Sequence, residues 1–178
     1  MKFKNQMQLD SIKQKMAVAQ NLCNKELNEF FTNVGIFKKI LISEKSNENV
    51  TKYRDRNGKD ALLLKPMPQV ALFKAIHFLK DKMDMDISSI YKALDRIDFS
   101  YPDQTKHQWL YWVISDAGTI TTSGKVESAL SRMLIYFAAG EAKCKKLENG
   151  DEWLAELFED YNFLMGGEET ELPKPLLK

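Results

Sequence analysis

The chain has 178 residues, of which 44% are hydrophobic and 29% charged, and its formal net charge is +1. This composition is ordinary for a soluble globular protein. No run approaches the roughly 18 apolar residues that a membrane span requires, so we expect no membrane association. The length suits one domain with a hydrophobic core, or a domain with a helical arm.

The charge is distributed unevenly. Residues 1–60 hold 12 Lys and Arg against 7 Asp and Glu, whereas residues 141–178 hold 5 against 10. A basic front fits polyanion binding, and it fits equally two ends that attract each other or are simply solvated. Cys23 and Cys144 form no CxxC pair, which argues against a disulfide scaffold or a zinc site and suits a cytoplasmic location.

From residue 9 to residue 34 apolar side chains recur at steps of three or four, which predicts one long amphipathic helix over residues 1–34 with Gly35 as its stop. Its apolar seam is a candidate for a homodimer or for a protein partner, and we expect it to lie mainly on the chain's own core because it has fewer than four clean heptads. The seam residues are Leu9, Ile12, Met16, Ala19, Cys23, Leu27, Phe30 and Val34.

Residues 36–42 form a second apolar piece, which we expect to be helical. Residues 43–59 are polar and contain Asn57-Gly58, a strong tight-turn signal, so we interpret them as an exposed loop.

The principal apolar helix is predicted after the run Leu62–Leu64. Two prolines push the residues before them out of the helical region, so we expect an extended segment up to Pro68 and a helix from there to Met83. We expect the other elements to pack against it. Its apolar stripe is predicted at Val70, Phe73, Ala75, Ile76, Phe78, Leu79 and Met83.

Three further helices are predicted from caps and apolar spacing. Asp86 caps a short helix over residues 87–97, Thr122 or Ser123 caps a helix that Gly140 ends, and Asp151 caps a last helix over residues 153–164 that Gly166-Gly167 stops. Between the first two, residues 109–114 and 119–122 alternate as strands around a turn and predict a β-hairpin.

The sequence therefore predicts a mainly α fold: a helical domain with one small β-hairpin, at about residues 109–122, packed on helices. The predicted parts are a long helix at residues 1–34, a core domain at residues 35–167 and a frayed tail at residues 168–178.

Several short pieces of residues 60–140 resemble the C-terminal part of DGQHR-domain proteins, which include the DNA phosphorothioation-associated regulator DndB. The pieces are the leucine run into Lys65-Pro66-x-x-Gln69, then Ile97-Asp98-Phe99-Ser100, Gly118-Thr119-Ile120 and Ser123-Gly124-Lys125-Val126-Glu127. The signature pentapeptide of that family is missing here, so its functional residues are not carried over.

The resemblance implies a DNA-associated binding or regulatory module that acts in transcription regulation. The candidate nucleic-acid contacts are Lys65, Gln69, Lys106 and Lys125, the last at a helix N-terminus where it can meet a phosphate. The alternative is a helical protein–protein interaction module of a larger complex, without nucleic-acid contact. The sequence has two His, no Cys–His pair and no phosphate loop, so we expect no catalytic residues, metal site or cofactor.

Overall fold

The computed structural model has six α-helices and one short 3₁₀-helix in the part of the chain that it describes. The prediction of a mainly α fold is thus confirmed. The chain divides into two compact units, Met1–Ser43 and Glu44–Lys178. The described residues are 2–35, 37–38, 61–99, 113–114, 120–121, 123–164 and 171–175.

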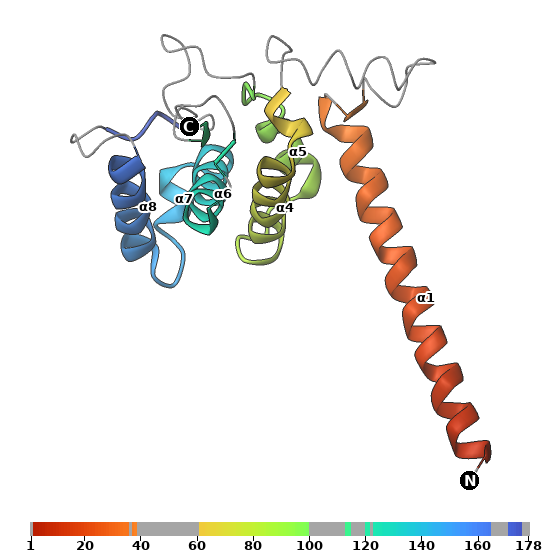
Figure 1. The fold of residues 1–178 in the computed structure, drawn as a ribbon. Helices are drawn as coiled ribbons and strands as arrows, with labels where there is room; N and C mark the ends of the chain where they lie inside the picture. The colour runs from red at the N-terminus through yellow and green to blue at the C-terminus, as the bar shows by residue number, and fades with distance from the viewer. Residues whose placement is uncertain are drawn as a thin grey trace. The chain divides into compact units, whose positions relative to one another are not determined.

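The first unit contains the long helix α1 (Lys2–Asn33), where the sequence predicts it (Figure 1). Its hydrogen-bond ladder continues past Asn33, since the Val34 amide donates to the Phe30 carbonyl and the Lys38 amide to the Val34 carbonyl. The predictions for residues 39–59, including the Asn57-Gly58 turn, lie outside the described residues.

The second unit begins with η1 (Ala61–Leu64), a 3₁₀-helix, and α4 (Pro66–Asp81). Lys65 is extended, as expected before Pro66, but the rest of the expected extended segment is wrong, and the helix starts two residues before Pro68. Both prolines fit because the first turn of a helix leaves its N–H groups without intrahelical partners. Gln69 closes the junction, because its Nε2 donates to the Leu63 carbonyl at 2.8 Å.

The buried face of α4 differs from the predicted stripe. Val70 is 42% exposed, and it lies across the helix from Leu72 and Leu79, which are buried. Ala75, Ile76 and Leu79 are buried as predicted. A helix of mixed apolar spacing offers more than one face, and tertiary packing selects among them. The buried residues of α4 are Met67, Pro68, Ala71, Leu72, Ala75, Ile76 and Leu79.

Helix α4 ends at Asp81, and the chain then turns at Asp84, whose φ of 48° is left-handed. Asp86 caps α5 (Ile87–Leu94) as predicted. The Asp86 carboxylate accepts from the Ser88 hydroxyl at 2.6 Å and from the Ser89 amide at 3.0 Å. These hydrogen bonds, that from Ser88 first, lower the pKa of Asp86 from its ordinary value.

Helix α6 (Gly124–Ala139) lies between α4 and α8 (Gly150–Leu164), and α5 also packs on it (Figure 1). Ser123 caps α6 by accepting from the Val126 amide at 3.2 Å, and Gly140 ends it at a φ of 81°, both as predicted. Eleven of its sixteen residues are buried. The expectation that the unit is organised around residues 68–83 is thus incomplete, since α6 is the more deeply enclosed helix.

A short helix that the sequence analysis missed, α7 (Glu141–Cys144), follows Gly140 directly. Helix α8 starts at Gly150, so Asp151 lies in its first turn and is not its cap. The predicted stop at Gly166-Gly167 lies outside the described residues, as does most of the tail.

The predicted hairpin is described at only four residues. Ile114 and Ile120 form an antiparallel bridge, and the Thr121 amide donates to the Val113 carbonyl at 2.8 Å. No longer strand occurs among the residues that the structure describes. Residues 109–112 and the turn at 115–119 lie outside them.

We predict opposite effects of alanine at two helix-start glycines. A Cβ at Gly150 would lie 2.5 Å from the carbonyl oxygens of Cys144 and Lys145, so Gly150→Ala must displace backbone and should destabilise the unit by about 1–3 kcal/mol. A Cβ at Gly124 meets nothing within 4 Å. Gly124→Ala should be neutral or stabilising by up to about 1 kcal/mol. Urea unfolding of both variants checks this, and equal stabilities would contradict the close approach at Gly150.

The capping role of Asp86 predicts a pH dependence. Because the folded-state pKa is lowered, the contribution of the carboxylate is complete above the unfolded-state pKa and is lost as the pH falls through the folded-state pKa. Asp86→Ala should therefore be less stable than the wild type near neutral pH, and the difference should shrink in acid. Thermal unfolding across that pH range measures it. A deficit independent of pH would show that the charge of Asp86 is irrelevant.

Candidate functional site

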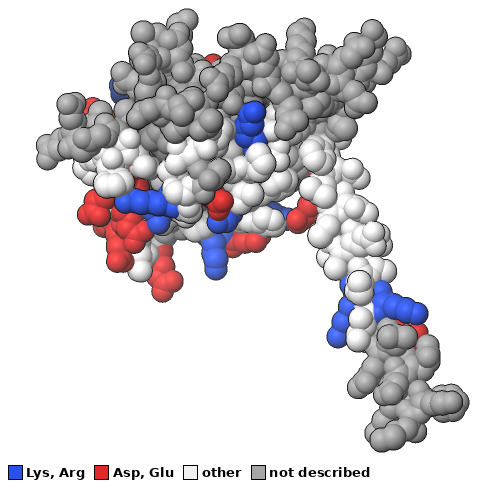
Figure 2. Space-filling model, in the orientation of Figure 1, with Lys and Arg blue, Asp and Glu red and all other residues white. Residues whose placement is uncertain are grey.

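The most unusual surface of the described chain is the apolar face of α1. We define the α1 seam as five residues that share this face at steps of three or four, namely Ile12, Met16, Ala19, Cys23 and Leu27. All five are exposed, and the large side chains of Ile12, Met16 and Leu27 are 54%, 66% and 40% exposed. In Figure 2 the visible face of α1 is largely white, that is, free of charged side chains, between the blue group of basic side chains and the C-terminal end of the helix.

The same face is covered at its C-terminal end. Phe30 and Val34 are buried, and Phe37 continues the line. The Phe30, Phe31 and Phe37 rings pack on one another at centroid distances of 5.1–5.5 Å. Within the first unit, Phe30 and Val34 are therefore covered, whereas the α1 seam is exposed. The side chain of Leu9 lies outside the described part.

A second exposed apolar pair lies on another face of α1. Val18 and Leu22 are 57% and 59% exposed and lie roughly 100–140° around the helix from the α1 seam. Exposed large hydrophobic residues are ordinary when they are scattered, but a contiguous group along one helix marks a surface that another chain covers. Val18 and Leu22 were not predicted as surface candidates because they do not follow the three- and four-residue spacing of the seam.

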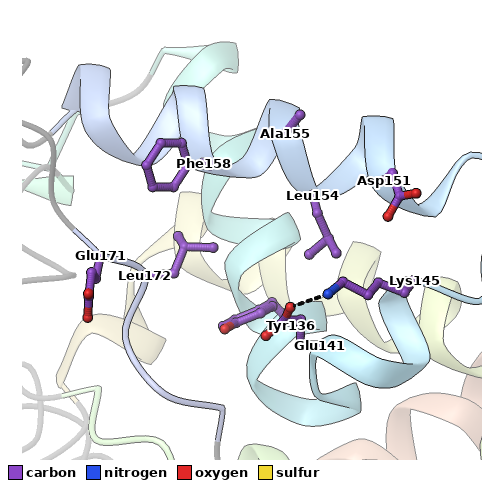
Figure 3. A pocket seen from close by; sticks show the side chains of 9 residues that line it. All are labelled: Tyr136, Glu141, Lys145, Asp151, Leu154, Ala155, Phe158, Glu171 and Leu172. Atoms are coloured by element: carbon purple, nitrogen blue, oxygen red, sulfur yellow. Dashed lines mark ion pairs between the residues drawn. The ribbon is translucent and has the colours of Figure 1, made fainter.

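The described part of the second unit contains a pocket of about 470 Å³ (Figure 3). Its apolar wall comes mostly from α8, and Leu172 of the C-terminal segment joins it. Its polar side comes from α6, α7 and the residue after it, where the Lys145 ammonium lies 2.6 Å from the Glu141 carboxylate. The lining residues are Tyr136, Glu141, Lys145, Asp151, Leu154, Ala155, Phe158, Glu171 and Leu172.

The electrostatics of this pocket are those of a structural site. Burial, followed by the negative charge of Glu141, raises the pKa of Tyr136, so its phenol stays protonated at neutral pH. The hydrogen bond to Glu141 raises the pKa of Lys145, which keeps the ammonium charged. Neither shift activates a nucleophile or a base. The pocket suits a small apolar group beside a neutral phenol.

Charged residues join α6 to α8 on another side of the unit. Arg132 forms ion pairs with Asp160 and, at 3.4 Å, with Glu156. The Lys125 ammonium lies 4.0 Å from the Asp160 carboxylate and 3.7 Å from the ring centroid of Phe163. Arg132 is a cation within an otherwise apolar run of the sequence, and this feature could have indicated a buried ion pair. Its position between two helices indicates a structural role.

The predicted nucleic-acid residues that the structure describes lie at two helix starts in the second unit. Gln69 uses its side-chain amide at the η1–α4 junction, and Lys125 points to α8. Lys65 is the N-cap residue of α4 and makes no ion pair within the described residues. Lys106 lies outside the described residues. Lys65 and Gln69 lie at the start of α4, and Lys125 lies at the start of α6.

Within the described residues no group of three or more His, Cys, Asp or Glu side chains could hold a metal ion. Burial raises the pKa of the Cys144 thiol to about 11, so it is not a nucleophile at neutral pH. Cys23 is a free, exposed thiol on the α1 seam. None of the helices in this part of the chain combines the length and apolar character that crossing a membrane requires.

Comparison of the sequence with protein families and with curated proteins, and of the structure with solved structures, gives no match. The functional proposal therefore rests on the geometry of the described residues, and within the first unit the α1 seam is the exposed apolar surface.

Proposed function

We propose that this protein is a helical interaction module that joins a protein assembly through the α1 seam. The observation that carries the proposal is the contrast along one helix face, where Phe30 is 1% exposed and Met16 is 66% exposed. Water-exposed Ile, Met and Leu at core-like spacing lose stabilisation that a covering surface would supply, at about 25 cal/mol per Å² of apolar area.

A protein is the best-suited occupant of this surface. The α1 seam is narrow and linear, which suits a second amphipathic helix packed along it. Small residues at Ala19 and Cys23 allow a close approach of such a helix. The two free thiols fit the reducing cytoplasm that we propose as its location.

This proposal predicts that a photo-crosslinking amino acid at position 16, in the cells that encode the chain, yields a covalent protein adduct. The same amino acid at position 14 should yield none, because Gln14 lies on the opposite face of α1 from Met16. Mass spectrometry of the adduct identifies the partner, and a self-adduct appears at twice the chain mass. Absence of an adduct at position 16, or equal adducts from both positions, would refute the proposal.

The second candidate function is the DNA-associated module of the DGQHR or DndB-like kind, acting in transcription regulation. Beyond the resemblance, its specific support is Lys65, a cation without an ion pair among the described residues, at the N-terminus of α4. Its weakness is that Pro66 and Pro68 remove two of the N–H groups with which a helix N-terminus binds phosphate. Lys106 stays a candidate contact.

If DNA binding occurs, fluorescence anisotropy with plain and phosphorothioated duplexes should show an affinity that falls steeply with salt. Lys65→Ala should weaken binding and reduce the magnitude of the salt slope by about 1, as the loss of one phosphate contact does. Lys74→Ala is the matched control, because Lys74 already pairs with Glu127 at 2.5 Å. Absence of binding at low salt would remove this function.

A further inference from the structure

The α1 seam is self-complementary when two copies run antiparallel. We place the crossing point of the two helices between Ala19 and Gln20. In an antiparallel pair, residues whose numbers sum to about 39 then lie at the same level along the two helix axes. Ile12 then faces Leu27 of the second copy, and Met16 faces its Cys23. Each large side chain thus meets an apolar partner.

The middle of this arrangement is small. Ala19 of one copy lies beside Ala19 of the other, which lets the two helix backbones approach closely at the crossing point. The bulkier pairs lie on both sides of it. The order of residues along the α1 seam thus places small side chains at the centre of the contact and larger ones toward its ends.

The charges of α1 favour the antiparallel orientation over the parallel one. Its N-terminal half carries Lys13 and Lys15 with Asp10, and its C-terminal half carries Glu26 and Glu29 with Lys25, so the balance is positive in the first half and negative in the second. In a parallel pair, like charges would lie at the same level of the two helices. In the antiparallel pair Lys15 lies opposite Glu26 of the second copy, on the flank that also carries Leu22.

We propose that the partner of the α1 seam is a second copy of this chain, bound antiparallel with Ala19 at the crossing point. This inference rests on the proposed function and names its partner. The paired segment is shorter than a standard interface requires, so the dimer forms reversibly and its population rises with protein concentration.

Disulfide trapping of the purified full chain tests the arrangement. In the proposed pair, the two Ala19 residues are offset by about 1.5 Å along the helix axis, and the two Cys23 residues by about 10 Å. A disulfide requires Cα atoms within roughly 7 Å of each other, so the two Cys23 residues are too far apart to form one. Cys144 is buried and does not compete. On mild oxidation at high concentration, Ala19→Cys in a Cys23→Ser background should give a disulfide-linked dimer as the main species. The wild type, with Cys23 alone, should stay monomeric on a non-reducing gel.

A second variant separates misfolding from a wrong arrangement. Met16→Cys in the wild-type background should also crosslink, because position 16 faces Cys23 of the second copy, whereas Gln14→Cys on the opposite face should not. Crosslinking through Cys23 alone would establish a parallel pair and overturn the inference. No crosslinking by any variant, with circular dichroism like that of the wild type, would also overturn it. In that case an adduct to a different protein from position 16 would leave the proposed function standing.

Discussion

The packing of α4 against α6 is the contact on which the rest of residues 61–164 depends. Helix α6 buries eleven of its sixteen residues, and a helix that is apolar on nearly every side folds only when neighbours cover it on all of them. Helix α4 covers one side with Ala71 and Ala75, both without exposed surface, and the Lys74–Glu127 pair joins the two helices at the rim. Helices α5 and α8 also pack on α6.

Local features of this unit could be predicted from the sequence because they depend on residues that are close in the chain. Asp86 and Ser123 cap helix N-termini because a side-chain acceptor is needed there, and Gly140 ends α6 because its positive φ favours a residue without a Cβ. Neither requirement depends on the surrounding fold. The start of α4 was misplaced because a proline fits more than one position of a first turn. The Leu62–Leu64 run was too short for its period to be recognised, and it forms a 3₁₀-helix.

The functional residues were harder to predict because their roles depend on distant partners. The spacing of α1 predicts which residues share a face, yet it says nothing about whether the surface that covers them belongs to the same chain. Lys125 has the composition of a phosphate ligand next to a helix N-terminus, but Asp160 and Phe163 of α8 lie beside its ammonium. Gln69 was a candidate base contact, and its side chain instead holds the entry to α4.

Helix α1 itself gives the strongest reason to look for a partner. Isolated helices are marginal in water, and most helices in proteins are stabilised by the packing of one face. The first turn of α1 has no acidic residue and its last turn no basic one, so the helix dipole gains little from its ends. Its Lys25–Glu29 pair is exposed and contributes at most a few tenths of a kcal/mol. The covered aromatic end can anchor the helix, but it cannot hold the exposed residues 12–27 in a helical conformation from a distance. If the proposed function holds, the ordering of this segment and its association with another chain are one coupled event.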